Sequence, residues 1–262
     1  MDSGLRTSAT GMRAQQIMVD TIANNLANVN TTGFKRSRVA FEDLLYENLQ
    51  GAAVTGGQDR QVISPVQIGK GVRLAGIARV HGQGSLQQTG RPQDMAIEGE
   101  GFFQVARPDG SIAFTRDGTF GMSDTGALVT NGGYRLLPGI TIPQDATSFG
   151  VSPSGIITVN IAGSSTPIEL GRIELARFVN PSGMQAIGEN LMIETAASGR
   201  PVTGFPQEQN FGRVLQGSLE SSNVEIVTEM TDMIAAQRAY EINAKAIRAS
   251  EEMAQTANDL IR

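Results

Sequence analysis

The chain contains no cysteine and only one histidine, His81, among its 262 residues. Without cysteine there is no thiol nucleophile, no disulfide and no zinc site of the usual Cys/His type. A single histidine without a nucleophile motif is more typical of a packing or surface residue than of a catalytic base, so we interpret His81 as structural. These absences exclude several common chemistries before any motif is considered.

Long apolar runs and excess positive charge are absent as well. Polar residues interrupt the N-terminal apolar positions, namely Gln15, Gln16, Asp20, Asn24 and Asn25, so a cleaved signal peptide is not expected. No run approaches the roughly 18 apolar residues of a membrane span. The net charge of -5 and pI near 5.0 argue against nucleic acid or an anionic membrane as the main partner. We therefore expect no membrane insertion, and either a cytoplasmic location or export by a signal-independent route.

Motifs for catalysis and cofactors are incomplete. The sequences GEG at 99–101 and GKG at 69–71 lack the full spacing of phosphate-binding loops. Carboxylates of the middle region could supply an acid/base pair, as in glycosidases, but acidic residues at turns are the usual case. They are Glu98, Glu100, Asp109, Asp117 and Asp124. We predict no catalytic residue, no cofactor and no metal ligand, and hence no enzyme.

The N-terminal stretch from Ser3 to Asn28 has the periodicity of a helix. Leu5, Met12, Val19 and Leu26 are seven residues apart, and Ile22 occupies the alternate position of the same stripe, which is a coiled-coil type of pattern. Asn24, Asn25 and Asn28 each weaken the helix by roughly half a kcal/mol. Either the helix frays before Thr32-Gly33, or these amides contact neighbouring chains.

The C-terminal stretch from Asn223 to Ile261 carries a second apolar seam with alternating steps of four and three residues. Ser222 and Glu225 resemble a capping box at its start. A helix of about 39 residues is about 58 Å long, too long for one compact domain to cover. Its seam consists of Ile226, Met230, Met233, Gln237, Tyr240, Ala244 and Ile247. The spacing is interrupted after Ile247, and the seam resumes with Met253, Ala257 and Leu260.

Turn residues and short apolar runs alternate between the two helices, which predicts short antiparallel strands joined by hairpins. The alternation changes phase across Gly171, which indicates a bulge or a break there. Residues 47–70 and 196–213 show no clear period and are interpreted as connectors. The expected strands are Gly101–Arg107, Ile112–Arg116, Ala127–Thr130, Tyr134–Leu137, Ile156–Ile161 and Ile168–Phe178.

The fold class is therefore expected to be mixed α and β in separate layers. Long N- and C-terminal helices would form a coiled-coil-like inner domain, and the middle would be an all-β domain of short antiparallel strands. We predict a helical polymerisation domain of residues 1–33 with 222–262, a connecting segment of 34–72 with 205–221, and an outer β domain of 73–204. Because neither helix has enough apolar partner surface in its own chain, the arrangement predicts a polymer.

Two long motifs lie at opposite ends of the chain. Residues 23–36 read ANNLANVNTTGFKR, and residues 233–247 read MIAAQRAYEINAKAI. Both resemble the flagellar rod and hook protein family. The middle adds GSLQQTG at 84–90, DMAIEGEGFF at 94–103 and FTRDG at 114–118, again similar to this family. Within it, FEDLLYENL at 41–49 and IGKGVR at 68–73 are similar to the distal-rod members.

The resemblance implies a structural subunit of the distal rod that self-assembles into a helical tube and transmits torque from motor to hook. It implies export through the flagellar type III apparatus, a place in the periplasm across the peptidoglycan, and proximal rod, hook, P-ring and L-ring proteins as neighbours. Another axial subunit of the same family is the alternative within this class. A periplasmic cell-wall hydrolase is the alternative from a different class.

The stripes of both helices then predict the subunit interface, with adjacent copies burying them against one another. The predicted interface residues are Leu5, Met12, Val19, Ile22, Asn24, Asn25, Leu26, Asn28, Met230, Met233, Gln237, Tyr240, Ala244, Ile247, Met253 and Leu260.

Overall fold

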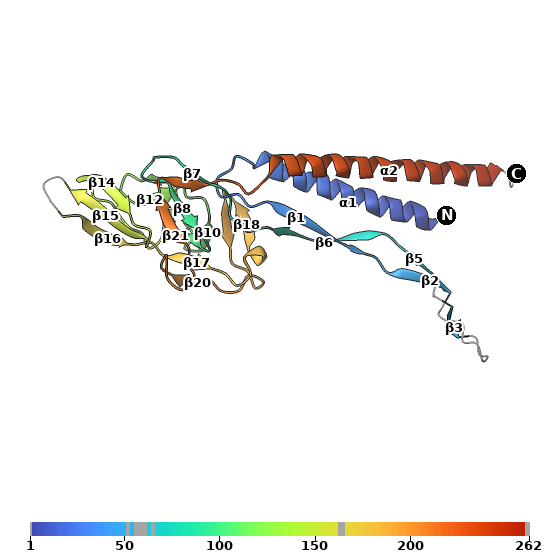
Figure 1. Cartoon of the computed structure of the whole chain (residues 1–262), viewed down its shortest axis with the longest axis horizontal. Helices are drawn as coiled ribbons and strands as arrows, with labels where there is room; N and C mark the ends of the chain where they lie inside the picture. Colours follow the sequence, from blue (N-terminus) through green and yellow to red (C-terminus); the bar gives the residue numbers. More distant parts are fainter. Residues whose placement is uncertain (1, 51–52, 55–61, 64–65, 162–165, 260–262) are drawn as a thin grey trace. The chain divides into compact units, whose positions relative to one another are not determined.

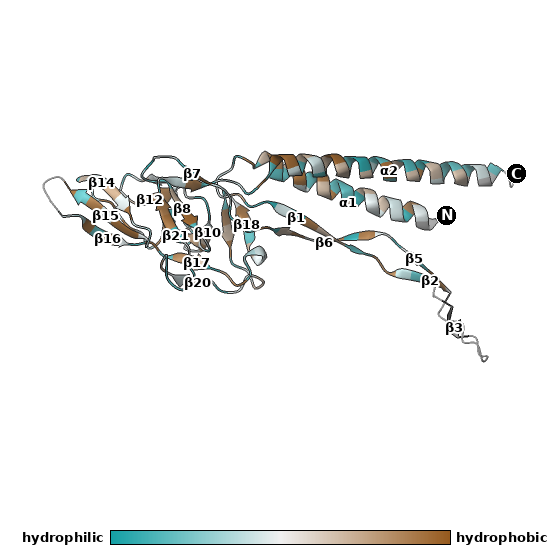
Figure 2. Ribbon diagram, viewed as in Figure 1, coloured by the Kyte–Doolittle hydropathy of each residue, from teal (hydrophilic) through white to brown (hydrophobic). Residues whose placement is uncertain are grey.

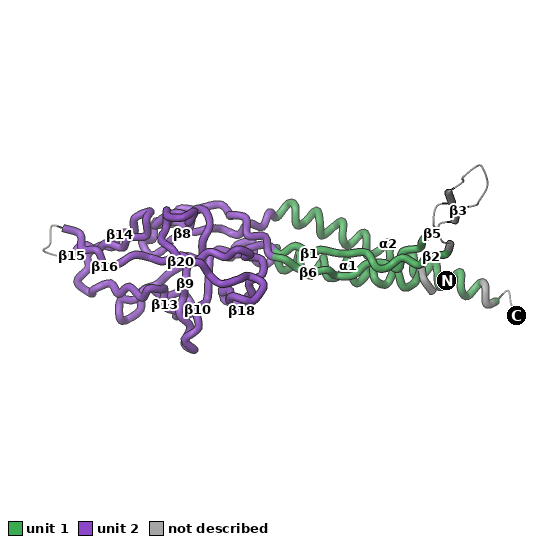
Figure 3. Tube along the Cα trace, turned by 90° about the horizontal axis from the view of Figure 1, so that it is seen from below, with its two compact units in different colours: residues 1–26, 37–78, 226–262 green, residues 27–36, 79–225 purple. Residues whose placement is uncertain are grey.

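The structure is a computed structural model that describes residues 2–50, 53–54, 62–63, 66–161 and 166–259. The chain divides into two compact units, coloured separately in Figure 3. Unit 1 comprises Met1–Leu26, Ser37–Ala78 and Ile226–Arg262, and unit 2 comprises Ala27–Arg36 and Arg79–Glu225. The backbone therefore crosses from one unit to the other four times.

Unit 1 contains both long helices, α1 (Asp2–Ala27) and α2 (Ile226–Asp259), drawn at the two ends of the colour scale in Figure 1. Its remaining strands form three separate two-stranded ribbons, in which β1 pairs with β6, β2 with β5 and β3 with β4. The strands are β1 (Ser37–Asp43), β2 (Tyr46–Gln50), β3 (Ala53–Val54), β4 (Val62–Ile63), β5 (Val66–Gly69) and β6 (Val72–Arg79).

Unit 2 is built around a nine-stranded sheet in the order β11-β12-β13-β9-β10-β19-β18, with β17 pairing both β9 and β20. All of these pairings are antiparallel. The strands are β9 (Phe102–Ala106), β10 (Ile112–Thr115), β11 (Phe120–Met122), β12 (Leu128–Thr130), β13 (Arg135–Leu136), β17 (Leu175–Arg177), β18 (Gln185–Gly188), β19 (Leu191–Ile193) and β20 (Val202–Gly204).

Smaller sheets complete unit 2. A three-stranded sheet runs β14-β15-β16, and two ribbons pair β21 with β8 and β22 with β7. One short 3-10 helix, η1, covers Pro181–Gly183. The strands are β7 (Leu86–Gln88), β8 (Met95–Glu98), β14 (Ala146–Val151), β15 (Ile156–Ile161), β16 (Ile168–Arg172), β21 (Arg213–Gln216) and β22 (Ser218–Glu220).

The main apolar core lies in unit 2, where the strands appear brown in Figure 2. Phe103 and Phe120 meet edge to face with their ring centroids 5.2 Å apart, a geometry that aromatic rings favour. A second cluster on the other side of β9 contains Phe102, Phe114 and Phe178. Because neighbouring residues of one strand point to opposite faces, Phe102 and Phe103 reach different clusters.

The predicted fold class is confirmed in its coarse form: a helix at each end and short antiparallel strands between them. The helices begin and end within three residues of their predicted limits, except that the last residues, 260–262, lie outside the described part of the chain. The break predicted at Gly171 is also confirmed, because the β15–β16 register shifts between Ile157 and Thr158, opposite this glycine.

Two expectations need correction. Residues 47–70 contain strands β2 and β5 paired antiparallel, with Glu47 opposite Ile68. Ser222 and Glu225 do not begin α2, which starts at Ile226; the Ser222 hydroxyl instead accepts a hydrogen bond from the Val224 N–H at 3.3 Å. The predicted domains, 1–33 with 222–262, 34–72 with 205–221 and 73–204, stay predictions. Which segments serve polymerisation stays a prediction.

Candidate assembly interface

The apolar stripe predicted for α1 lies partly inside unit 1. Leu5, Met12, Val19 and Leu26 are half-buried, and Ile22 is buried with 5% of its surface exposed. The stripe thus has one side against its own unit and one side in solvent.

The seam predicted for α2 is divided between buried and exposed positions. Met233, Ala244 and Ile247 are half-buried, Gln237 is exposed, and Leu260 lies outside the described residues. Met230, Tyr240 and Met253 are exposed by 51%, 43% and 60%. Much of the predicted seam is therefore open to solvent in a single subunit.

The face of α2 that the subunit does bury consists of smaller or polar residues. Glu229 and Ala236 are buried, and Asn243, Ser250 and Ala254 continue the same face half-buried. Meanwhile Val227, Ile234 and Ile242 are exposed by 74%, 50% and 66%. In Figure 2 the α2 ribbon alternates between hydrophobic and hydrophilic colours along its length. The helix hence has one face for its own unit and large apolar side chains that lack an intramolecular partner surface.

The two helices approach closely near Gly11. A Cβ placed on Gly11 would lie 3.1 Å from Nδ2 of Asn243, so a larger side chain there would require the Asn243 side chain to move. Nearby, Gln16 and Val19 of α1 line a groove of about 540 Å³ with Gln237, Tyr240 and Glu241 of α2. This groove brings together three of the predicted interface residues.

The predicted asparagines differ in their roles. Asn25 is only 1% exposed, and its amide bonds inside unit 1. Its Oδ1 accepts from the Ser37 N–H at 2.8 Å, while its Nδ2 donates to the Ser37 carbonyl at 2.9 Å and to Glu229 Oε2 at 3.1 Å. Asn28 Oδ1 accepts from the Thr31 hydroxyl at 3.1 Å, and Asn24 is exposed. Asn25 therefore connects α1 to β1 and α2. Neither of the two interpretations drawn from the sequence, a frayed helix end or contact with a neighbouring chain, included this role.

Unit 2 contains a group of charges that the sequence did not reveal. Lys35, Arg116 and Glu220, here called the buried ion cluster, are exposed by 2%, 6% and 0%. Lys35 Nζ lies 2.5 Å from Glu220 Oε1, and Arg116 Nη1 lies 3.3 Å from Glu220 Oε2. Burial lowers the pKa of Lys35 and of Arg116, while Glu220 acts in the opposite direction on both. One carboxylate thus compensates two buried cations.

Backbone groups complete this cluster. Lys35 also donates to the Gly82 carbonyl at 2.8 Å, the Gly84 N–H donates to Glu220 Oε1 at 2.9 Å, and Arg116 Nη2 donates to the Gly99 carbonyl at 2.6 Å. A Cβ on Gly84 would lie 1.9 Å from the Ser221 carbonyl oxygen, so only glycine permits this approach. The cluster holds together segments that adjoin three of the four crossings between the units.

Asn223 acts beside the cluster in a similar way. Its Oδ1 accepts from the Arg36 N–H at 2.8 Å, and its Nδ2 donates to the Val80 carbonyl at 2.8 Å. A side-chain amide offers one donor group and one acceptor, as a peptide group does. It can therefore bond to the backbone of two segments in the way that a neighbouring strand would. The chain is therefore pinned by directional bonds just where it leaves unit 2.

Three protein-family profiles match the chain. Residues 5–35 match "Flagella basal body rod protein", 96–159 match "Flagellar hook protein FlgE/F/G D1 domain", and 215–260 match "Flagellar basal body rod FlgEFG protein C-terminal". The flagellar basal-body rod protein FlgG of Borreliella burgdorferi is 48% identical over 264 residues, covering 100% of both chains. FlgG of Caulobacter vibrioides is 45% identical over 257 residues, covering 98% of both. The chain belongs to the FlgG family of flagellar basal-body rod proteins.

Similarity to a sister protein supports this branch of the family. The basal-body rod protein FlgF of Caulobacter vibrioides is 35% identical over 263 residues, covering 98% of this chain, which is below the 45% of FlgG from the same organism. This FlgG family member is a structural subunit of the flagellar distal rod, located in the flagellar basal body. The alternative of a proximal rod or hook subunit is not supported.

The FlgG family is one of structural flagellar proteins, which implies that the chain is not an enzyme. Among the described residues there is no group of three or more His, Asp or Glu placed to hold a metal ion. Within the same residues, no helix is long and apolar enough to cross a membrane. His81 is half-buried and meets Phe102 edge to face at 5.8 Å between ring centroids. Burial, aided by Lys35, Arg79 and Arg116, lowers the pKa of His81 to about 4.

Proposed function

We propose that this FlgG family member polymerises into a helical tube through α1 and α2, and that the tube acts as the drive shaft that transmits torque from motor to hook. The observation that carries the proposal is the exposure of large apolar side chains along α2, including Val227 at 74%, Ile242 at 66% and Met253 at 60%. A single subunit leaves these side chains in water, and adjacent copies would bury them.

The interface that we propose contains the exposed and half-buried members of the predicted set. On α1 these are Leu5, Met12, Val19, Asn24, Leu26 and Asn28, and on α2 Met230, Met233, Gln237, Tyr240, Ala244, Ile247 and Met253. Ile22 and Asn25 are already buried in their own unit, so we propose that they support the interface from behind. Leu260 remains a proposed member. A coiled-coil type of packing between copies would suit the four-three steps of the α2 seam.

The remaining parts of the proposal follow from membership in the family of axial proteins. The subunit would leave the cell through the flagellar type III export apparatus without a cleaved signal peptide, and would assemble in the periplasm across the peptidoglycan. Its neighbours would be the proximal rod proteins, the hook protein, and the P-ring and L-ring proteins. We propose no catalytic role.

Replacement of two exposed methionines tests the assembly surface. Met230→Ser together with Met253→Ser should raise the critical concentration for assembly by roughly 10- to 200-fold. Full burial of a methionine contributes about 1.5–3 kcal/mol, and 51% and 60% of the two side chains remain to be buried. Each 1.4 kcal/mol is about tenfold in concentration. Sedimentation of the purified chain over a range of concentrations measures this, and motility of cells that produce only the variant gives a second readout.

Met122→Ser is the matched control. Met122 lies on β11 in unit 2 and is 48% exposed, close to the 51% of Met230, so the chemical change is the same outside the proposed interface. The control should assemble at the wild-type concentration. If the double variant also does so with an unchanged helical circular dichroism signal, α2 does not form the interface and the proposal fails.

A further inference from the structure

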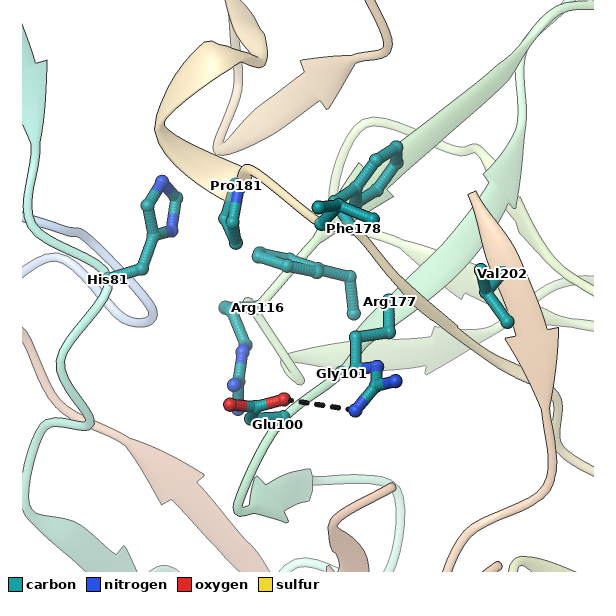
Figure 4. A pocket seen from close by; sticks show the side chains of 10 residues that line it. His81, Glu100, Gly101, Arg116, Arg177, Phe178, Pro181 and Val202 are labelled. Carbon is teal, nitrogen blue, oxygen red and sulfur yellow. Dashed lines mark hydrogen bonds and ion pairs between the residues drawn. The ribbon is translucent and has the colours of Figure 1, made fainter. Parts of the chain in front are cut away.

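Unit 2 contains a pocket that none of the preceding roles uses. It has a volume of about 390 Å³, with Arg116, Arg177 and Glu100 at one side and Phe178, Val179 and Val202 at the other. Figure 4 shows the Glu100 carboxylate between the two guanidinium groups, with Arg177 Nη1 3.4 Å from Glu100 Oε2. The pocket thus combines charged side chains with apolar side chains.

Arg116 lines the pocket and has one donor that is not used. Its two terminal nitrogens bond to Glu220, Ile97 and Gly99, but its buried Nε has no hydrogen-bond partner among the described residues. A buried donor without a partner loses about 1–3 kcal/mol of hydration that nothing replaces. An acceptor that drew the guanidinium group toward the pocket could remove that deficit.

The electrostatic surroundings favour a negative ligand. Lys35, Arg79 and Arg116 all lower the pKa of His81, after burial itself, so the positive field extends across the pocket to the imidazole. Glu220 is shared between Lys35 and Arg116, and Glu100 pairs with Arg177. In the described part of the chain, Glu100 and Glu220 therefore carry fewer charges than the cations that surround them, namely Lys35, Arg79, Arg116 and Arg177.

We propose that this pocket binds a protein partner through a glutamate or aspartate side chain that lies next to an aliphatic residue. Glu100 shows that a carboxylate fits between Arg116 and Arg177, because it already lies there in the free chain. It is 72% exposed and lies between β8 and β9, so an incoming carboxylate can displace its side chain without unfolding either strand. The partner's aliphatic residue can pack against Val179 and Val202, which are exposed by 90% and 46%.

The single histidine makes the binding measurable. The probes are N-acetyl-glutamyl-valinamide and its neutral match, N-acetyl-glutaminyl-valinamide, added to the purified full-length chain and followed by NMR at the His81 ring. The glutamyl peptide should bind about tenfold more tightly than the glutaminyl peptide, since a charge-assisted hydrogen bond separates them. It should also raise the pKa of His81 by offsetting the positive field.

Variants at the pocket separate its parts. Glu100→Gln removes the internal competitor and should tighten binding of the glutamyl peptide, whereas Arg177→Gln should weaken it. Glu98→Gln is the matched control, because Glu98 pairs with Arg213 at 2.7 Å outside the pocket, and should leave binding unchanged. If Arg177→Gln fails to fold, Glu100→Gln still decides the matter, because its effect is a gain.

Several results would overturn the proposal. Equal binding of both peptides would reduce the pocket to an apolar depression. Inorganic phosphate or acetate matching the glutamyl peptide in affinity would indicate a site for free anions, without a peptide partner. An equal effect of Glu98→Gln and Glu100→Gln would indicate that overall charge, and not the pocket, controls binding. None of these measurements requires assembly, so the pocket can fail while the proposed polymerisation stands.

Discussion

Glu220 offers the sharpest test of the buried ion cluster. Glu220→Gln keeps the shape of the side chain and one acceptor oxygen but removes the only negative charge bonded to Lys35 and Arg116 in the described residues. Both cations stay buried, at 2% and 6% exposure. Because water cannot reach them, they keep the cost of desolvation and lose the attraction that offsets it.

The size of the effect follows from the burial. Removal of one partner from a buried ion pair typically costs about 3–5 kcal/mol. For a folding unit of more than 150 residues, each kcal/mol lowers Tm by about 2–4 °C, so the expected shift is roughly 6–20 °C. Lys35→Met should cost less, since Glu220 then still has Arg116.

Urea and thermal unfolding of the full-length chain, followed by circular dichroism of the strands, would measure these differences. Glu98→Gln serves as the control, because Glu98 also pairs with an arginine at 2.7 Å but at the surface. Its Tm should hardly change. If Glu220→Gln is no more destabilising than this control, charge compensation does not hold the cluster, and our account of unit 2 is wrong.

Two further predictions concern Asn25 and His81. Asn25→Ala should lower the free energy of unfolding by about 1–3 kcal/mol for each buried group left unpaired at Ser37 and Glu229. Asn24→Ala, at an exposed position, should change it by less than about 0.5 kcal/mol. Hydrogen exchange at the Ser37 amide distinguishes the two variants, and slow exchange in Asn25→Ala would contradict the role of Asn25 in holding α1 to β1. As the pH falls from 6.5 to 4, the unfolded chain gains a proton at His81 and the folded chain does not, because the pKa of His81 in the folded chain is lowered to about 4. The free energy of unfolding should therefore decrease by up to about 3 kcal/mol over this fall in pH. His81→Leu should remove that part of the pH dependence in urea titrations, and an unchanged profile would refute it.

Sequence patterns identified strands that bury one or both faces and missed strands that bury neither. β9 and β15 were located from the sequence because the apolar residues of each strand fall between clear turns. The β2–β5 ribbon was read as a connector, since Tyr46, Glu47, Asn48 and Leu49 are all exposed. Alternation arises only where one side of a strand packs on a core, so this ribbon has no pattern to detect.

The interface prediction followed the four-three spacing of mainly apolar residues along α2. Ala236 and Glu229 are buried within the subunit, while Met230 and Met253 are exposed. Spacing alone selects side chains that need a partner without distinguishing an internal partner from an external one. The ion cluster was invisible for another reason: Lys35 and Glu220 are separated by 185 residues, and nothing in either local sequence marks the pair.

Apolar and polar contacts serve different ends in this chain. Unit 2 and unit 1 are joined by four backbone crossings, and Asn25, Asn223 and Glu220 lie close to them in sequence or bond to residues beside them. Hydrogen bonds and ion pairs are directional, so they fix geometry more than they add stability; buried ion pairs often gain nothing over apolar residues of the same size. Hydrophobic burial is not directional, which suits the exposed face of α2, where affinity between copies would be required. The proposed drive shaft would need both: copies that bind tightly, and directional bonds within each unit that hold its backbone segments in place.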